Sequence, residues 1–108
     1  PGQTEFIAER CGITAENAVM MLAGPSLRVV PLTVHIPLSA VPDALTAELI
    51  ITKARVTARG LTRDFGIAAP RLAITGLNPH AGEGGQLGGE DQSVIAPAVA
   101  LLRDEGIN

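Results

Sequence analysis

The sequence predicts an α/β fold, and three observations support this class. Segments with helical spacing of apolar residues alternate with short runs of β-branched and aliphatic residues. Glycine and proline residues, which favour turns, stand between these segments. Hydrophobic residues make up 46% of the chain and charged residues 18%, which is enough apolar material for a packed core. The alternation predicts at least one βαβ crossover.

The first elements are a short helix and two strands. The helix is expected at Thr4–Gly12, with Thr4 as the N-cap and Gly12 as the C-terminal stop. Two apolar runs, Val19–Ala23 and Leu27–Ile36, predict buried strands. The turn at Gly24-Pro25-Ser26 would join them.

The rest of the chain predicts a crossover helix, a third strand and a final helix. After a loop at Pro37–Asp43, residues Thr46–Arg63 carry apolar side chains on one helical face. Arg71–Leu77 is expected to be a strand and Asn78–Gly89 a glycine-rich loop. Glu90–Glu105 completes the order as a helix.

Composition excludes several classes of function. The net charge is −3, and the eight basic residues are scattered rather than clustered with aromatic residues, so a nucleic-acid surface is not expected. No stretch reaches about 18 uninterrupted apolar residues, the length of a membrane-spanning helix. Cys11 is the only cysteine and lies in no metal-binding cysteine pattern, which favours a reducing, cytoplasmic location.

The chain has two histidines, His35 and His80. His35 is expected at the carboxyl end of a strand, and His80 in the loop directly after another. The carboxyl ends of parallel strands meet at one edge of a sheet, where ligands bind. Two imidazoles that converge there would form part of a metal site. For either histidine alone, a structural or solvated role is the alternative.

Two ligands rarely hold a catalytic divalent ion, which generally takes three protein groups. Glu83 is a candidate third ligand, although its flanking glycines make it equally suited to hydrogen bonding within the loop. Otherwise the third ligand comes from outside this chain. The glycines at 82–89 also suggest a phosphate-binding loop, but neither the P-loop nor the GxGxxG spacing is present.

Three segments together resemble the 4-hydroxythreonine-4-phosphate dehydrogenase family. They begin at Pro1-Gly2-Gln3-Thr4-Glu5-Phe6, at Val34-His35-Ile36-Pro37-Leu38, and at Asp64-Phe65-Gly66-Ile67. The third extends through Asn78-Pro79-His80-Ala81-Gly82-Glu83-Gly84-Gly85, which is the most specific string. The similarity runs over essentially all 108 residues.

The resemblance implies a partial domain, residues 1–108, from the middle of a longer dehydrogenase with an isopropylmalate-dehydrogenase-like α/β/α fold and a mixed sheet. It implies a homodimer and a divalent metal such as zinc, magnesium or cobalt, bound by three histidines. His35 and His80 match two of them, and the third would come from an absent segment of the partner subunit. The family uses NAD or NADP to oxidise 4-phosphohydroxy-threonine, which then loses carbon dioxide on the route to pyridoxal phosphate.

The resemblance also places substrate contacts at Gln3 and Thr4, where a plain helix cap is the simpler interpretation from composition. The family has histidine where this chain has Gln3. Glutamine donates a hydrogen bond but carries no positive charge, which makes a four-carbon sugar-acid phosphate an alternative substrate. A non-catalytic α/β binding or dimerisation module is the alternative from another class. The 108 residues alone are expected to be inactive.

Overall fold

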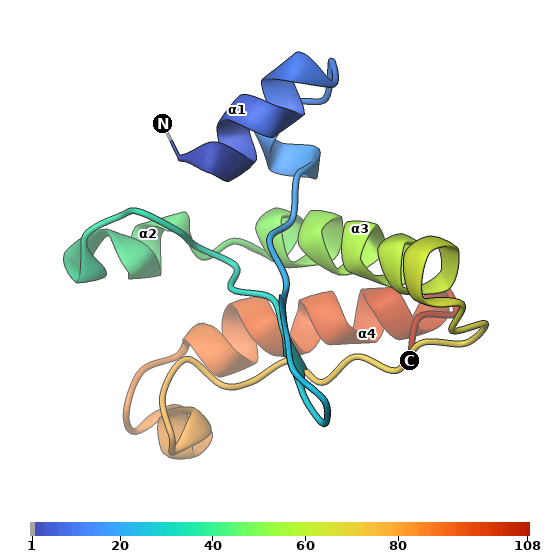
Figure 1. Cartoon of the computed structure of the whole chain (residues 1–108). Helices are drawn as coiled ribbons and strands as arrows, with labels where there is room; N and C mark the ends of the chain where they lie inside the picture. The colour runs from blue at the N-terminus through green and yellow to red at the C-terminus, as the bar shows by residue number, and fades with distance from the viewer. Residues whose placement is uncertain (1) are drawn as a thin grey trace.

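Two packed helices, α3 and α4, form the centre of the structure, a computed structural model that describes residues 2–108 (Figure 1). The helical elements in chain order are α1 (Gln3–Arg10), η1 (Ala15–Asn17), η2 (Leu38–Ala40), α2 (Val41–Ala44), α3 (Ala47–Phe65), η3 (Ala81–Gly85), η4 (Asp91–Ile95) and α4 (Ala96–Asp104). The sheet among the described residues has two strands, β1 (Leu22–Ala23) and β2 (Arg28–Val29). The chain is therefore mostly helical.

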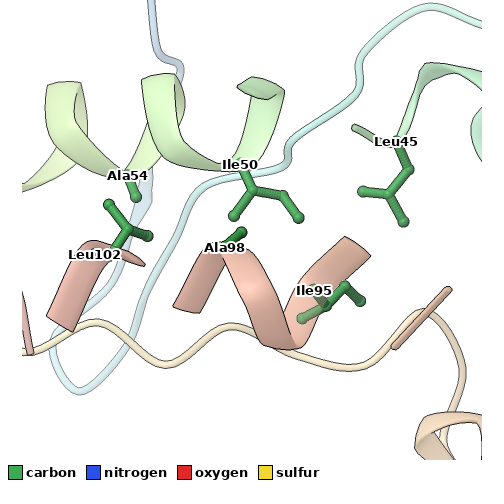
Figure 2. Close-up of a cluster of buried hydrophobic side chains, with 6 residues drawn as sticks. All are labelled: Leu45, Ile50, Ala54, Ile95, Ala98 and Leu102. Carbon is green, nitrogen blue, oxygen red and sulfur yellow. The ribbon is translucent and has the colours of Figure 1, made fainter. Parts of the chain in front are cut away.

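The core lies between α3 and α4. Figure 2 shows Leu45 and side chains of α3 facing side chains of η4 and α4. This cluster consists of Leu45, Ile50, Ala54, Ile95, Ala98 and Leu102. Two small alanines within it let the helices approach closely, and the aliphatic side chains fill the remaining space. Burial of this apolar surface holds the two halves of the chain together.

The bounds of α3 follow from its end residues, and the predicted helix is confirmed. Thr46 is the N-cap, and its hydroxyl accepts a hydrogen bond from the Leu49 N–H at 3.1 Å. Gly66 ends the helix with φ 70°, a left-handed conformation that glycine adopts without steric cost. The buried face carries Ile50, Ala54 and Ala58, as the helical spacing predicts.

The last helix is confirmed in place but is less regular than expected. Residues Asp91–Ile95 form a π-type turn, and the α-helix proper runs over Ala96–Asp104. Pro97 lies in the first turn of α4, where it has no N–H to donate to the preceding turn. The irregular turn before it is consistent with that missing hydrogen bond.

The prediction of two long buried strands is wrong. β1 and β2 are two residues each, pair antiparallel with Leu22 opposite Val29, and are exposed. Both runs are apolar enough to be covered on two faces, yet Figure 1 shows the hairpin crossing α4 in the view, with its turn extending past that helix. Arg28 instead stacks on the Phe65 ring at 4.8 Å from its centre, which ties the hairpin to the end of α3.

The predicted strand at Arg71–Leu77, and with it the βαβ crossover, does not form within the described residues. Exposure nevertheless alternates along this segment, and Leu72 and Ile74 pack on the core, as a strand pattern requires. The Leu72 N–H donates to the Asn108 carbonyl at 2.7 Å. A strand needs a neighbouring backbone to pair with, and residues 2–108 provide no ladder here.

Two local expectations need correction, and a third is confirmed. Gly2, not Thr4, is the N-cap of α1, and Thr4 lies within the first turn. The segment Pro37–Asp43, expected to be a loop, contains η2 and the start of α2. Gly12 does adopt a left-handed conformation directly after the C-cap of α1, as expected of a helix stop.

Candidate metal and substrate site

His35 lies in the segment between β2 and η2, not at a strand end as expected, and its imidazole packs against the start of α1. A Cβ added at Gly2 would lie 2.7 Å from His35 Cε1 and 2.7 Å from Glu5 Oε2. A side chain at position 2 would therefore displace the imidazole or the Glu5 carboxylate from its present position. The structure thus brings His35 beside the segment that contains Gln3 and Thr4.

Glu5 adds an unpartnered carboxylate to this place. Its Oε2 is buried and has no hydrogen-bond partner among the described residues. A buried carboxylate oxygen without a donor is costly and is normally satisfied by protein, water or an ion. The donor that satisfies Glu5 is therefore expected from outside residues 2–108, or from a bound ligand.

His80 lies at the start of the glycine-rich loop and is held by its neighbours. Its Nδ1 is 2.8 Å from Glu83 Oε1. Its backbone N–H donates to Asn78 Oδ1 at 2.8 Å, and its carbonyl accepts from the Glu83 N–H at 3.0 Å. Because Nδ1 faces the carboxylate, Nε2 is left available to a ligand.

Backbone strain among the described residues gathers at the two histidines. Three residues other than glycine have positive φ: His35 at 56°, Ala81 at 48° and Glu83 at 45°. One is a predicted ligand, and the other two lie within three positions of His80. A left-handed residue with a Cβ costs roughly 1–2 kcal/mol, and such residues cluster at functional sites.

Stability does not explain the strain at Glu83. Its side chain and that of His80 are 48% and 61% exposed, and an exposed ion pair contributes roughly 0.2–1 kcal/mol before screening by salt. The pair therefore does not offset the conformational cost of Glu83. The His80–Glu83 contact therefore brings no net gain in stability. Because it lies at a predicted metal ligand, it points to a functional role.

Within one chain, the two histidines belong to different regions. Figure 1 shows the start of α1 above the α3 and α4 pair and the loop of η3 below it. The segment between β2 and α2, which contains His35, also runs above α4 in this view. No group of three or more His, Cys, Asp or Glu side chains among residues 2–108 is placed to hold a metal ion. The parallel sheet whose edge was expected to bring the two histidines together does not form among residues 2–108, so their convergence stays a prediction.

The donor chemistry at each histidine still fits one ligand of a metal centre. His80 has one ring nitrogen beside a carboxylate and the other free, the usual arrangement of a metal-binding imidazole. His35 is exposed beside the orphaned oxygen of Glu5. Each residue therefore suits a site that other parts of the protein complete.

The arginines of α3 are a second group of charges, and two of them are paired. Arg55 forms a bidentate pair with Glu105, with Arg55 Nε 2.9 Å from Glu105 Oε2. Hydrogen bonding to Arg55 holds the pKa of Glu105 below its usual value. Arg63 pairs with Asp64 at 2.8 Å and lowers the pKa of that carboxyl in the same way. Much of this positive charge is therefore balanced locally.

Sequence reasoning missed Glu5 and assigned Glu83 only in part. The sequence leaves Glu83 open as a direct ligand or as a hydrogen-bonding residue of the loop, and in the structure its carboxylate contacts His80 Nδ1. Its spacing of three residues from His80 is a signal that favours such contact. Nothing in the sequence around Glu5 indicates that His35 lies nearby, because 30 positions separate the two.

The chain belongs to the family described as "Pyridoxal phosphate biosynthetic protein PdxA", whose profile matches residues 1–108. It is 62% identical over 107 residues to a 4-hydroxythreonine-4-phosphate dehydrogenase of Erythrobacter litoralis, covering 99% of this chain and 32% of that protein. A protein of the same name from Zymomonas mobilis is 58% identical over 108 residues, again covering 32% of its length. The chain spans about a third of the curated relatives it matches.

Solved structures agree with this family. A 4-hydroxythreonine-4-phosphate dehydrogenase from Klebsiella pneumoniae superimposes with a TM-score of 0.90 at 40% identity, over 99% of this chain and 32% of that one. A terephthalate 1,2-cis-dihydrodioldehydrogenase from Burkholderia xenovorans gives 0.87 at 34% identity, over 100% and 35%. The Klebsiella and Burkholderia dehydrogenases, which are named for different substrates, thus both share the fold of this chain.

Proposed function

We propose that this chain is part of a 4-hydroxythreonine-4-phosphate dehydrogenase that acts in pyridoxal phosphate biosynthesis. The observation that supports the proposal is the match of the family profile to the whole chain, including the segments around both histidines. The proposed reaction oxidises the secondary hydroxyl of 4-phosphohydroxy-threonine with NAD or NADP and then releases carbon dioxide. The enzyme is proposed to be cytoplasmic; among the described residues, no helix is long and apolar enough to cross a membrane.

His35 and His80 are proposed as ligands of a divalent metal. An ion held there would supply Lewis-acid chemistry, drawing electron density from the substrate oxygens during oxidation and decarboxylation. This chain's contribution is to hold the two imidazoles: Gly2 leaves room for His35, and Glu83 contacts His80. Gln3 and Thr4, at the start of the helix beside His35, are proposed to donate hydrogen bonds to the substrate.

No group of three or more metal-binding side chains gathers among residues 2–108, which favours a metal centre completed by another subunit. We propose a homodimer in which His35 and His80 of one subunit bind the metal together with a third ligand from the partner subunit. A two-fold axis then makes two equivalent centres. The third ligand is proposed to come from a part of the enzyme outside these residues.

Mixed dimers of the full-length enzyme test this arrangement. A dimer of one His35→Ala subunit and one His80→Ala subunit keeps one intact pair if the ligands come from different subunits. It keeps none if both come from the same subunit. Continued inactivity after verified subunit exchange supports the proposed arrangement, and activity that appears on mixing the two inactive homodimers contradicts it.

The second candidate function is that of a related dehydrogenase with another substrate. Two observations favour it: the similarity to the Burkholderia dehydrogenase, and Gln3 at the position where the family has histidine. Assays of the full-length enzyme with 4-phosphohydroxy-threonine and with a four-carbon sugar-acid phosphate separate the two. The Gln3→His variant should raise kcat/KM for 4-phosphohydroxy-threonine if that is not the main substrate. A third alternative, a non-catalytic binding or dimerisation module, requires that the full-length protein show no turnover with either substrate.

A further inference from the structure

We propose that Glu83 is a positioning residue, which fixes the ring of His80 so that Nε2 faces the metal. The inference rests on the proposed metal role of His80, and it adds Glu83 to the residues that this chain contributes to the metal site. It is carried by the 2.8 Å contact between His80 Nδ1 and Glu83 Oε1. With Nδ1–H donating to the carboxylate, the lone pair of a neutral imidazole lies on Nε2.

The backbone around Glu83 is shaped to make this contact. Gly82, Glu83 and Gly84 all adopt left-handed conformations, with φ of 72°, 45° and 69°. The resulting turn directs the Glu83 carboxylate back to the residue three positions earlier. Glutamate is an unfavourable choice for such a backbone, where glycine or asparagine is common. Its side chain is therefore the reason for its presence.

The residues on both sides of the pair hold the turn in place. Asn78 Oδ1 accepts from the His80 N–H, and the Glu83 N–H donates to the His80 carbonyl. Gly82 is buried, and a Cβ there would come within 2.8 Å of the Gly88 carbonyl oxygen. Both ends of the His80–Glu83 contact are thus fixed by backbone interactions, which limits the orientations open to the imidazole.

The test uses the full-length enzyme and two measurements. The first is the affinity for Co²⁺, followed by its visible spectrum. The second is the tautomer of His80 in the metal-free protein, from ¹⁵N chemical shifts assigned with His80→Ala. Glu83→Gly removes the carboxylate and keeps the left-handed backbone, and Glu83→Gln keeps a hydrogen-bond acceptor. Glu90→Gln, the control, changes a carboxylate that follows the loop, at the start of the last helix.

We expect wild type to carry the proton on Nδ1. Glu83→Gly should lose this preference and bind Co²⁺ about 10–100-fold more weakly, without a lower unfolding midpoint. Glu83→Gln should retain most of the affinity, and Glu90→Gln all of it. Wild-type affinity in Glu83→Gly overturns the proposal, whatever the tautomer. If His80→Ala leaves the Co²⁺ affinity unchanged, the proposed metal role of His80 fails. If His80→Ala lowers the affinity and Glu83→Gly does not, only the positioning role of Glu83 is refuted.

Discussion

The Ile50 side chain of α3 points at Ala98 of α4, and the two residues are 0% and 1% exposed (Figure 2). They lie in the middle of the cluster that joins the two long helices. The contact leaves no room for a larger residue on α4. This contact fixes the packing of α3 on α4.

Ala98→Leu should therefore destabilise the enzyme. Forcing extra methylene groups into a packed contact costs typically about 1–3 kcal/mol. Ala100→Leu is the matched control, because Ala100 lies on the exposed face of the same helix. Urea unfolding of the full-length enzyme measures both variants. Equal unfolding midpoints for the two would contradict the packing described here.

Gly82→Ala should disrupt the loop that carries His80, whereas Gly84→Ala should be tolerated better. Both glycines have positive φ, so both variants carry the left-handed cost of roughly 1–2 kcal/mol. Only at Gly82 does the added Cβ also meet a backbone oxygen, Gly88 O at 2.8 Å; at Gly84 nothing lies within 4 Å. Metal affinity measured by calorimetry should fall further in Gly82→Ala, and the reverse order would contradict the loop geometry.

Gly2→Ala should weaken metal binding by displacing His35. The added Cβ would lie 2.7 Å from His35 Cε1, so the imidazole or the start of α1 must move. Gly24→Ala is the control, since its Cβ would meet only the Leu27 carbonyl oxygen at 3.7 Å. A Co²⁺ titration compares the two variants with wild type. A Gly2→Ala enzyme that binds the metal normally would show that His35 is not held as described or is not a ligand.

The pair between Arg55 and Glu105 should make stability depend on pH. The pKa of Glu105 is lowered in the folded chain, so its stabilising effect is complete above the ordinary carboxyl range near about 4.3. It is lost as the pH falls through the folded-state pKa. Wild type should therefore exceed Glu105→Gln in melting temperature at pH 7, and the difference should shrink toward pH 3.

Salt and a second variant check the origin of that effect. Both side chains are partly exposed, so raising the ionic strength should reduce the difference between wild type and Glu105→Gln. Glu9→Gln, on α1, changes an exposed carboxylate of the same type and should show no comparable dependence. A difference that persists unchanged at pH 3 would mean that Glu105 acts through packing rather than charge.

The sequence by itself determined the features that depend on near neighbours. The hydroxyl of Thr46 and the missing Cβ of Gly66 set the ends of α3, and both can be read from the order of residues. The motif around His80 identified the family, and the profile match confirmed it. The contact from His80 to Glu83 also joins residues only three positions apart.

Only the tertiary structure decided the features that depend on distant segments. Arg71–Leu77 has the alternation of a strand, but a strand needs a ladder of hydrogen bonds to a neighbouring backbone. Leu72 donates to the Asn108 carbonyl, and no ladder forms here among residues 2–108. The position of His35 beside Glu5 brings together residues that are 30 positions apart in the sequence. Spacing along the chain cannot give this result, because a side chain's neighbours in space are set by how whole elements pack.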